Sequence, residues 1–152
     1  MKVCVMSRLL AEEYSRGKHD ESSVLISIAS KEQPDAEVSC NEDNNLKDIL
    51  FLHFNDTDSL DVDSGHIVDE DAEQIKEFVN KYKDTDIDTL IVNCGAGQSR
   101  SAGVAAAILM YLTGSDRQIY DDKKYTPNRL CYSTVLKAFN GETDYASIFG
   151  GV

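Results

Sequence analysis

The stretch that decides the fold is Thr89-Leu90-Ile91-Val92-Asn93-Cys94-Gly95-Ala96-Gly97-Gln98-Ser99-Arg100-Ser101, followed at once by an apolar run over residues 102–112. Residues 89–93 are apolar and β-branched, which predicts a buried strand. Residues 101–112, closed by Thr113-Gly114, predict a helix. The glycine-containing turn between them lies at the helix N-terminus, where free backbone N–H groups and the helix dipole attract an anion. The order strand, loop, helix therefore predicts a phosphate-binding loop.

The rest of the chain alternates short apolar segments with amphipathic ones. Strands are expected at residues 3–6, 24–28 and 49–54, helices at 9–14, 117–120 and 128–139, and loops at 35–47 and 55–67. Ala72, Ile75 and Phe78 recur at helical spacing after an acidic start at Asp69 and Asp71, which predicts another amphipathic helix. Alternating strands and helices predict an α/β fold with a central, mostly parallel sheet flanked by helices. The sequence has no linker or repeat, so residues 1–152 are expected to form a single domain.

Composition and charge limit the binding partners and the cellular compartment that are expected for this chain. The chain has 15 Lys and Arg against 27 Asp and Glu, a net charge of -12 that disfavours nucleic acid and anionic membranes as partners. Its longest apolar run is too short to span a bilayer, and its first residues lack a signal peptide's apolar core. Cysteines at positions 4, 40, 94 and 131 form no CxxC or Cys/His cluster. We therefore expect no metal site, no disulfide framework and a cytoplasmic location.

Within the loop, Cys94 and Arg100 suit covalent phosphate chemistry. A cysteine at a helix N-terminus beside a cation is expected to have a lowered pKa and to be a thiolate. Arg100 is spaced to return its guanidinium group to the same loop, where it can hold two phosphoryl oxygens. Gly95 and Gly97 allow a tight turn and a close approach of the anion. The residues expected to bind phosphate are Gly95, Ala96, Gly97, Gln98, Ser99 and Arg100.

The run Cys94-Gly-Ala-Gly-Gln-Ser-Arg-Ser101 resembles the Cys-x5-Arg signature loop of the cysteine-dependent protein tyrosine phosphatases, in its dual-specificity form Cys-x-Ala-Gly-x-Ser-Arg-Ser. Weaker similarity to small prokaryotic members extends to residues 24–28, 54–58 and 125–129. The resemblance implies that family's fold and a two-step hydrolysis without metal or other cofactor. Cys94 attacks phosphorus, Arg100 and loop amides hold the oxygens, an Asp protonates the leaving group, and water hydrolyses the phosphocysteine. Ser101 is implied to hydrogen-bond the Cys94 sulfur and help it leave.

The sequence offers three candidates for the acid that this resemblance requires. Asp56 follows the third expected strand closely, at the end where parallel sheets gather their ligand-facing groups. The tripeptide Asn55-Asp56-Thr57 also resembles the acid-bearing loop of dual-specificity enzymes. Asp61 and Asp63 match the usual separation from the cysteine better. We predict Asp56 as the general acid and keep Asp61 and Asp63 as alternatives.

One departure from the family leaves other functions open. The family usually has His directly before the nucleophile, and this chain has Asn93, which forms hydrogen bonds but has no cationic form. A catalytically weak phosphate- or phosphopeptide-binding protein is therefore an alternative. An arsenate-reductase-like redox enzyme shares the Cys-x5-Arg loop and requires a second cysteine, such as Cys131, near Cys94.

The loop also bears on the substrate. It contains no Lys and no second Arg, which disfavours inositol lipids and RNA ends with additional phosphates. We expect a phosphorylated protein or a small aryl phosphate as substrate, phosphotyrosine first and phosphoserine or phosphothreonine if the pocket is shallow. Phosphate or another oxyanion is the expected occupant of the loop.

Overall fold

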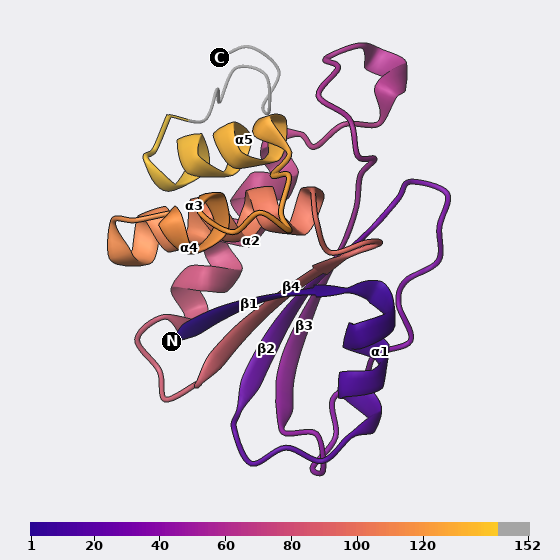
Figure 1. Cartoon of the computed structure of the whole chain (residues 1–152), viewed down its shortest axis with the longest axis vertical. Helices are drawn as coiled ribbons and strands as arrows, with labels where there is room; N and C mark the ends of the chain where they lie inside the picture. Colours follow the sequence, from indigo (N-terminus) through magenta and orange to yellow (C-terminus); the bar gives the residue numbers. More distant parts are fainter. Residues whose placement is uncertain (143–152) are drawn as a thin grey trace.

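The computed structural model describes residues 1–142, which form an α/β domain around an entirely parallel sheet (Figure 1). The sheet has four strands in the order β1-β4-β2-β3. Their bounds are β1 (Lys2–Ser7), β2 (Ser23–Ala29), β3 (Leu46–His53) and β4 (Thr89–Cys94). Because the strands are parallel, their carboxyl ends meet at one edge of the sheet. The predicted phosphate loop begins at that edge, where β4 ends between β1 and β2.

Helices cover the two faces of the sheet unequally. Helices α2 (Asp69–Tyr82), α3 (Arg100–Thr113), α4 (Arg117–Tyr120) and α5 (Arg129–Phe139) lie on one side, and α1 (Arg8–Arg16) lies on the other (Figure 1). Successive side chains of β2 point to opposite faces of the sheet, as strand geometry requires. Val24 and Ile26 belong to the large core under α2, α3 and α5, whereas Leu25 belongs to a small core with Leu46 and Ile91 on the α1 side.

The expected strands and helices are found, with shifts at their ends. Strand β3 begins at Leu46, which the sequence placed in a loop, because its side chain is buried in the small core and its backbone pairs with Ser23. Helix α1 begins at Arg8, since the Ser7 hydroxyl accepts a hydrogen bond from the N–H of Leu10 and caps it. The expected loop over residues 55–67 contains a short 3-10 turn, Val62–Ser64.

Helix α3 is the buried centre of the helical layer. Every residue from Arg100 to Leu109 is buried, which explains its small, apolar sequence. Gly103 has a packing reason: a Cβ there would lie 2.5 Å from the carbonyl oxygen of Asn128 and 3.1 Å from the Cβ of Cys131. The glycine thus lets the first turn of α5 approach α3 closely, just behind the phosphate loop. Among residues 1–142, no helix has the length and apolar character needed to cross a membrane.

Candidate active site

The phosphate loop (residues 94–101) lies against the end of β1. Gly97 has φ 72°, and a Cβ there would come within 2.6 Å of the backbone nitrogen of Ser7, so glycine is required for both conformation and space. The carbonyl of Gly95 accepts a 3.0 Å hydrogen bond from the N–H of Arg8. On the other side, the carbonyl of Ser99 accepts one from the N–H of Asn128 at 3.0 Å. The loop is thus fixed from both sides by backbone hydrogen bonds.

The thiol of Cys94 is buried at the end of β4, with Sγ 3.0 Å from the Ser101 hydroxyl. Burial alone raises the pKa of a thiol, because it disfavours the charged form. Hydrogen bonds from the Ser101 hydroxyl and from the amides of Ser101 and Gly97, together with the charge of Arg100, outweigh burial. The pKa of Cys94 is therefore lowered from its ordinary value, in the direction that a nucleophilic thiolate requires.

Arg100 starts α3 and is 7 % exposed. One of its terminal nitrogens, Nη1, donates to the carbonyl of Phe54 at 3.0 Å and to the hydroxyl of Ser30 at 3.1 Å. Its Nε is buried and has no hydrogen-bond partner among residues 1–142. A Cβ on Gly95 would lie 3.3 Å from Nη2, so glycine keeps the space next to this nitrogen open. Because an unpaired buried N–H of a cation is costly, an oxyanion in the loop is the partner that both charge and geometry favour.

The carboxylate of Asp56 is tied to the phosphate loop. Its Oδ1 accepts a 2.7 Å hydrogen bond from the Ser99 hydroxyl and a 3.0 Å bond from Nδ2 of Asn128. The same Nδ2 donates to the carbonyl of Thr57 at 3.2 Å, which holds the following residue as well. Its other oxygen, Oδ2, accepts no hydrogen bond in the part of the chain that the structure describes. This carboxylate is thus oriented through one oxygen, while the other accepts no hydrogen bond from residues 1–142.

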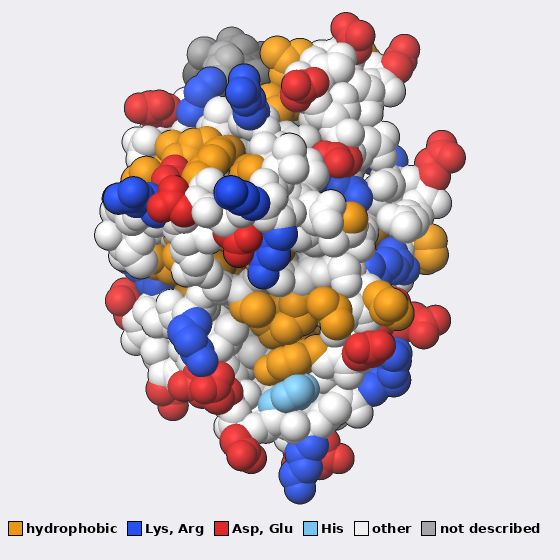
Figure 2. All heavy atoms as spheres, in the orientation of Figure 1, with side chains coloured by type: hydrophobic (Ala, Val, Ile, Leu, Met, Phe, Trp, Pro, Cys, Tyr) orange, Lys and Arg blue, Asp and Glu red, His pale blue; other side chains and the backbone are white. Residues whose placement is uncertain are grey.

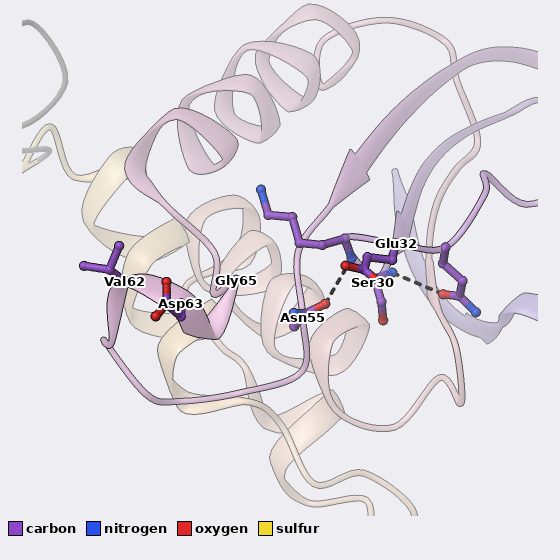
Figure 3. Close-up of a pocket in the computed structure, with 8 residues that line it drawn as sticks. Ser30, Glu32, Asn55, Val62, Asp63 and Gly65 are labelled. Atoms are coloured by element: carbon purple, nitrogen blue, oxygen red, sulfur yellow. Dashed lines mark hydrogen bonds between the residues drawn. The ribbon is translucent and has the colours of Figure 1, made fainter.

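Asp61 and Asp63 lie farther along the same loop, around the 3-10 turn. Both are exposed, and Asp63 lines a hollow opposite Glu32, with Asn55 between them (Figure 3). Asn55 fixes this region, since its Oδ1 accepts from the N–H of Lys31 at 3.0 Å. Across residues 1–142, neither Asp61 nor Asp63 has a hydrogen bond to the phosphate loop. Of the three candidate acids, only Asp56 has that contact.

Two residues of the site were missed by sequence reasoning. The Oδ1 of Asn128 caps α5 by accepting from the N–H of Cys131 at 2.9 Å, and its Nδ2 also donates to Asp56. Ser30, which bonds Arg100, directly follows β2, and the rule that ligand-facing groups follow parallel strands was a signal for it. His53 supports Ser30: its Nδ1 donates to the Ser30 carbonyl at 3.1 Å, while its Nε2 lies 2.7 Å from a carboxylate oxygen of Asp35.

Asn93, in the place where the resembled family has His, supports the loop weakly. Its Nδ2 donates to the carbonyl of Cys94 at 3.4 Å, a long hydrogen bond. Its Oδ1 is buried without a partner among residues 1–142. Asn93 thus gives the loop a single long hydrogen bond within residues 1–142.

The cysteines bear on the redox alternative, which requires a second thiol near Cys94. All four, Cys4, Cys40, Cys94 and Cys131, are free. Cys131 is buried in α5, where burial first and the negative charge of Asp56 second raise the pKa of its thiol. A thiol with a raised pKa is a poor partner for disulfide exchange. Residues 1–142 also contain no cluster of three His, Cys, Asp or Glu side chains that could hold a metal ion.

Comparisons with proteins of known structure identify the fold. No protein-family model and no curated protein matches the chain. Human DUSP28 is similar in structure, with a TM-score of 0.55 and 18% identity over 91% of this chain and 92% of that one. The human tyrosine phosphatase-like serine/threonine/tyrosine-interacting protein has a TM-score of 0.53 and 19% identity, over 86% of this chain and 80% of its own. PTPMT1 in complex with PI(5)P has a TM-score of 0.54 and 15% identity, over 93% and 92%. The chain therefore has the α/β fold of the cysteine-based protein tyrosine phosphatases.

Proposed function

We propose that this chain is a phosphomonoester hydrolase that forms a phosphocysteine intermediate on Cys94. The observation that carries the proposal is the buried Cys94 thiol, 3.0 Å from the Ser101 hydroxyl and next to a guanidinium group whose Nε has no partner within residues 1–142. A nucleophile of lowered pKa beside an unpaired cationic donor is the arrangement that phosphoryl transfer requires. The fold, shared with tyrosine and dual-specificity phosphatases, supports the same reaction class.

In the first step, the Cys94 thiolate attacks phosphorus while the bond to the leaving oxygen breaks. Asp56, protonated on Oδ2, gives its proton to that oxygen, so an alcohol or phenol departs. Arg100 and the loop amides stabilise the charge on the three remaining phosphoryl oxygens, which is the main catalytic contribution in this chemistry.

In the second step, Asp56 takes a proton from water as the water oxygen attacks phosphorus. The S–P bond breaks, inorganic phosphate leaves and the thiolate is restored. The Ser101 hydroxyl donates to the departing sulfur and so makes it a better leaving group. No metal is needed, because Arg100 and backbone N–H groups supply the positive field.

As substrate we propose phosphotyrosine or, more broadly, phosphoproteins of the dual-specificity type. The phosphate loop offers no Lys and only one Arg, which suits a single phosphoryl group. PTPMT1 was crystallised with PI(5)P, so a phosphoinositide belongs in the substrate panel as a comparison. The free cysteines fit the reducing cytoplasm that we propose as the location.

The decisive experiment is hydrolysis of p-nitrophenyl phosphate over a range of pH by the wild-type protein and Cys94→Ser. We expect phosphate release by the wild type and none by the variant. Acid quenching of the wild-type reaction, followed by mass spectrometry, is expected to find phosphate on Cys94. Absence of Cys94-dependent release at every pH would contradict the proposal.

A phosphopeptide-binding protein without turnover is the second candidate, favoured by the unpartnered Oδ1 of Asn93. The similar human protein whose name includes "tyrosine phosphatase-like" and "interacting" is consistent with such a role. This function predicts phosphopeptide binding by the wild type with no phosphate release. Asn93→His separates the two candidates, since a gain of turnover in this variant shows that only loop support was lacking.

A further inference from the structure

A small apolar hollow adjoins the phosphate loop on the side away from Asp56. Val5 and Met6 at the end of β1, with Leu10 in the first turn of α1, form one wall. Ala96 and Gly97 of the phosphate loop form part of the other wall. The hollow therefore shares Ala96 and Gly97 with the loop that is proposed to hold the phosphoryl group.

Exposed apolar side chains surround the same place. In Figure 2, hydrophobic side chains gather in the middle of the visible face, over β1 and the start of α1 as located in Figure 1. Leu10 is 54 % exposed and its neighbour Leu9 is 63 % exposed. The two leucines add apolar surface next to the phosphate loop, at the edge of the hollow. Only Leu10 of the pair lines the hollow.

The size of the hollow indicates what fits. Its volume of about 250 Å³ is below the range of about 300–1,000 Å³ for drug-sized ligands. It suits one aliphatic side chain, while the rest of the ligand lies outside. The charged residue that lines the hollow is Lys124, whose Nζ lies 5.0 Å from the centroid of the Tyr125 ring.

The opposite side of the phosphate loop has a different character. The hollow beside Ser99 is lined by Asp56 and Asp58, with Arg129 as the cation. A substrate segment that crosses the phosphate loop thus meets an apolar surface with a lysine on one side and carboxylates on the other. This asymmetry disfavours a basic residue next to Leu10 and favours an uncharged, apolar one there.

We propose that the hollow formed by Val5, Met6, Leu10 and Ala96 is a specificity subsite, which takes an aliphatic side chain next to the phosphorylated residue of a protein substrate. The proposal rests on the phosphatase function argued above and names its substrate class. Leu10 acts as a specificity residue and takes no part in the chemistry.

The test compares phosphotyrosine peptides that carry leucine, serine or lysine beside the phosphotyrosine, on either side. Two measurements are made: kcat/KM with the wild type, and peptide affinity for Cys94→Ser by fluorescence anisotropy. Burial of one aliphatic side chain predicts a preference of about tenfold for leucine over serine in both. Leu10→Ser is expected to reduce this ratio to about one, while Leu9→Ser keeps it, since Leu9 is at least as exposed as Leu10 but lies outside the hollow.

The outcomes separate this proposal from the proposed function. Cys94-dependent hydrolysis with equal kcat/KM for the three peptides overturns the subsite and leaves the phosphatase function intact. A leucine preference in binding without any hydrolysis supports the subsite and contradicts the phosphatase function. A ratio that Leu9→Ser and Leu10→Ser reduce equally overturns the assignment to this hollow. Faster hydrolysis of PI(5)P micelles than of every peptide, lost in Leu10→Ser, overturns the protein substrate in favour of a lipid.

Discussion

Replacement of Ser101 by alanine tests the electrostatics of the nucleophile most directly. The Ser101 side chain is fully buried, and its hydroxyl lies 3.0 Å from the Cys94 sulfur. A hydrogen bond to a charged group contributes about 1.5–3 kcal/mol. Since 1.36 kcal/mol corresponds to a factor of ten, loss of this donor is expected to weaken ionisation of Cys94 about tenfold to a hundredfold. The direction follows from the structure: the donor lowers the pKa of Cys94, so its removal raises that pKa.

The assay is alkylation of Cys94 by iodoacetamide across pH, followed by mass spectrometry of the peptide that contains Cys94, so that the other cysteines do not interfere. In Ser101→Ala the rate of Cys94 alkylation should reach its plateau at a higher pH than in the wild type. The acid limb of p-nitrophenyl phosphate hydrolysis should move the same way. Ser99→Ala is the control, because its hydroxyl bonds Asp56 and not the sulfur. A midpoint that stays in place, or moves to lower pH, would refute the role given to Ser101.

Three further predictions concern the acid and the positions that hold the site. Asp56→Asn should lower kcat for phosphotyrosine by about 10²–10⁴-fold, whereas Asp61→Asn and Asp63→Asn should keep a kcat near wild type. A large fall in kcat in either of the latter variants would assign the general-acid role to that residue instead. Gly97→Ala should lower the free energy of unfolding by about 1–3 kcal/mol, read from the urea midpoint, since its φ is 72° and its Cβ would meet the end of β1. Asn128→Ser should keep the cap of α5, and so the urea midpoint, while kcat falls because Asp56 loses a donor; unchanged kcat would show that Asn128 only caps the helix.

The phosphate loop could be predicted from the sequence because its parts are contiguous. An apolar β-branched strand, a glycine turn and an apolar helix follow one another without interruption, so local preferences already direct the backbone of residues 94–101 into one shape. The pKa direction at Cys94 follows from the same local features, since its donors and cation all belong to this loop. The parallel sheet was accessible for a similar reason, because strands that alternate with helices return in the same direction.

The ends of elements were less predictable, as β3 shows. Leu46 is separated by Lys47 and Asp48 from the apolar run that predicts this strand, so the sequence places the strand's start three residues too late. Leu46 belongs to the strand because its side chain completes the small core with Leu25 and Ile91 and its backbone pairs with Ser23. The sequence shows Asn93 where the resembled family usually has His, but only the structure shows that its Oδ1 has no partner among residues 1–142.

By itself, the sequence predicted the proposed nucleophile Cys94, the arginine Arg100 and the loop between them, because these lie on one continuous segment whose local structure holds them together. The sequence already favoured Asp56 over Asp61 and Asp63, and only the tertiary structure shows its contact with the phosphate loop and adds Ser30 and Asn128 to the site. Their contacts join residues that are 43, 70 and 72 positions apart: Ser99 with Asp56, Arg100 with Ser30, and Asn128 with Asp56. No local preference encodes such pairs. They form because a parallel sheet brings the carboxyl ends of its strands to one edge, and because Gly103 lets α5 approach α3 there.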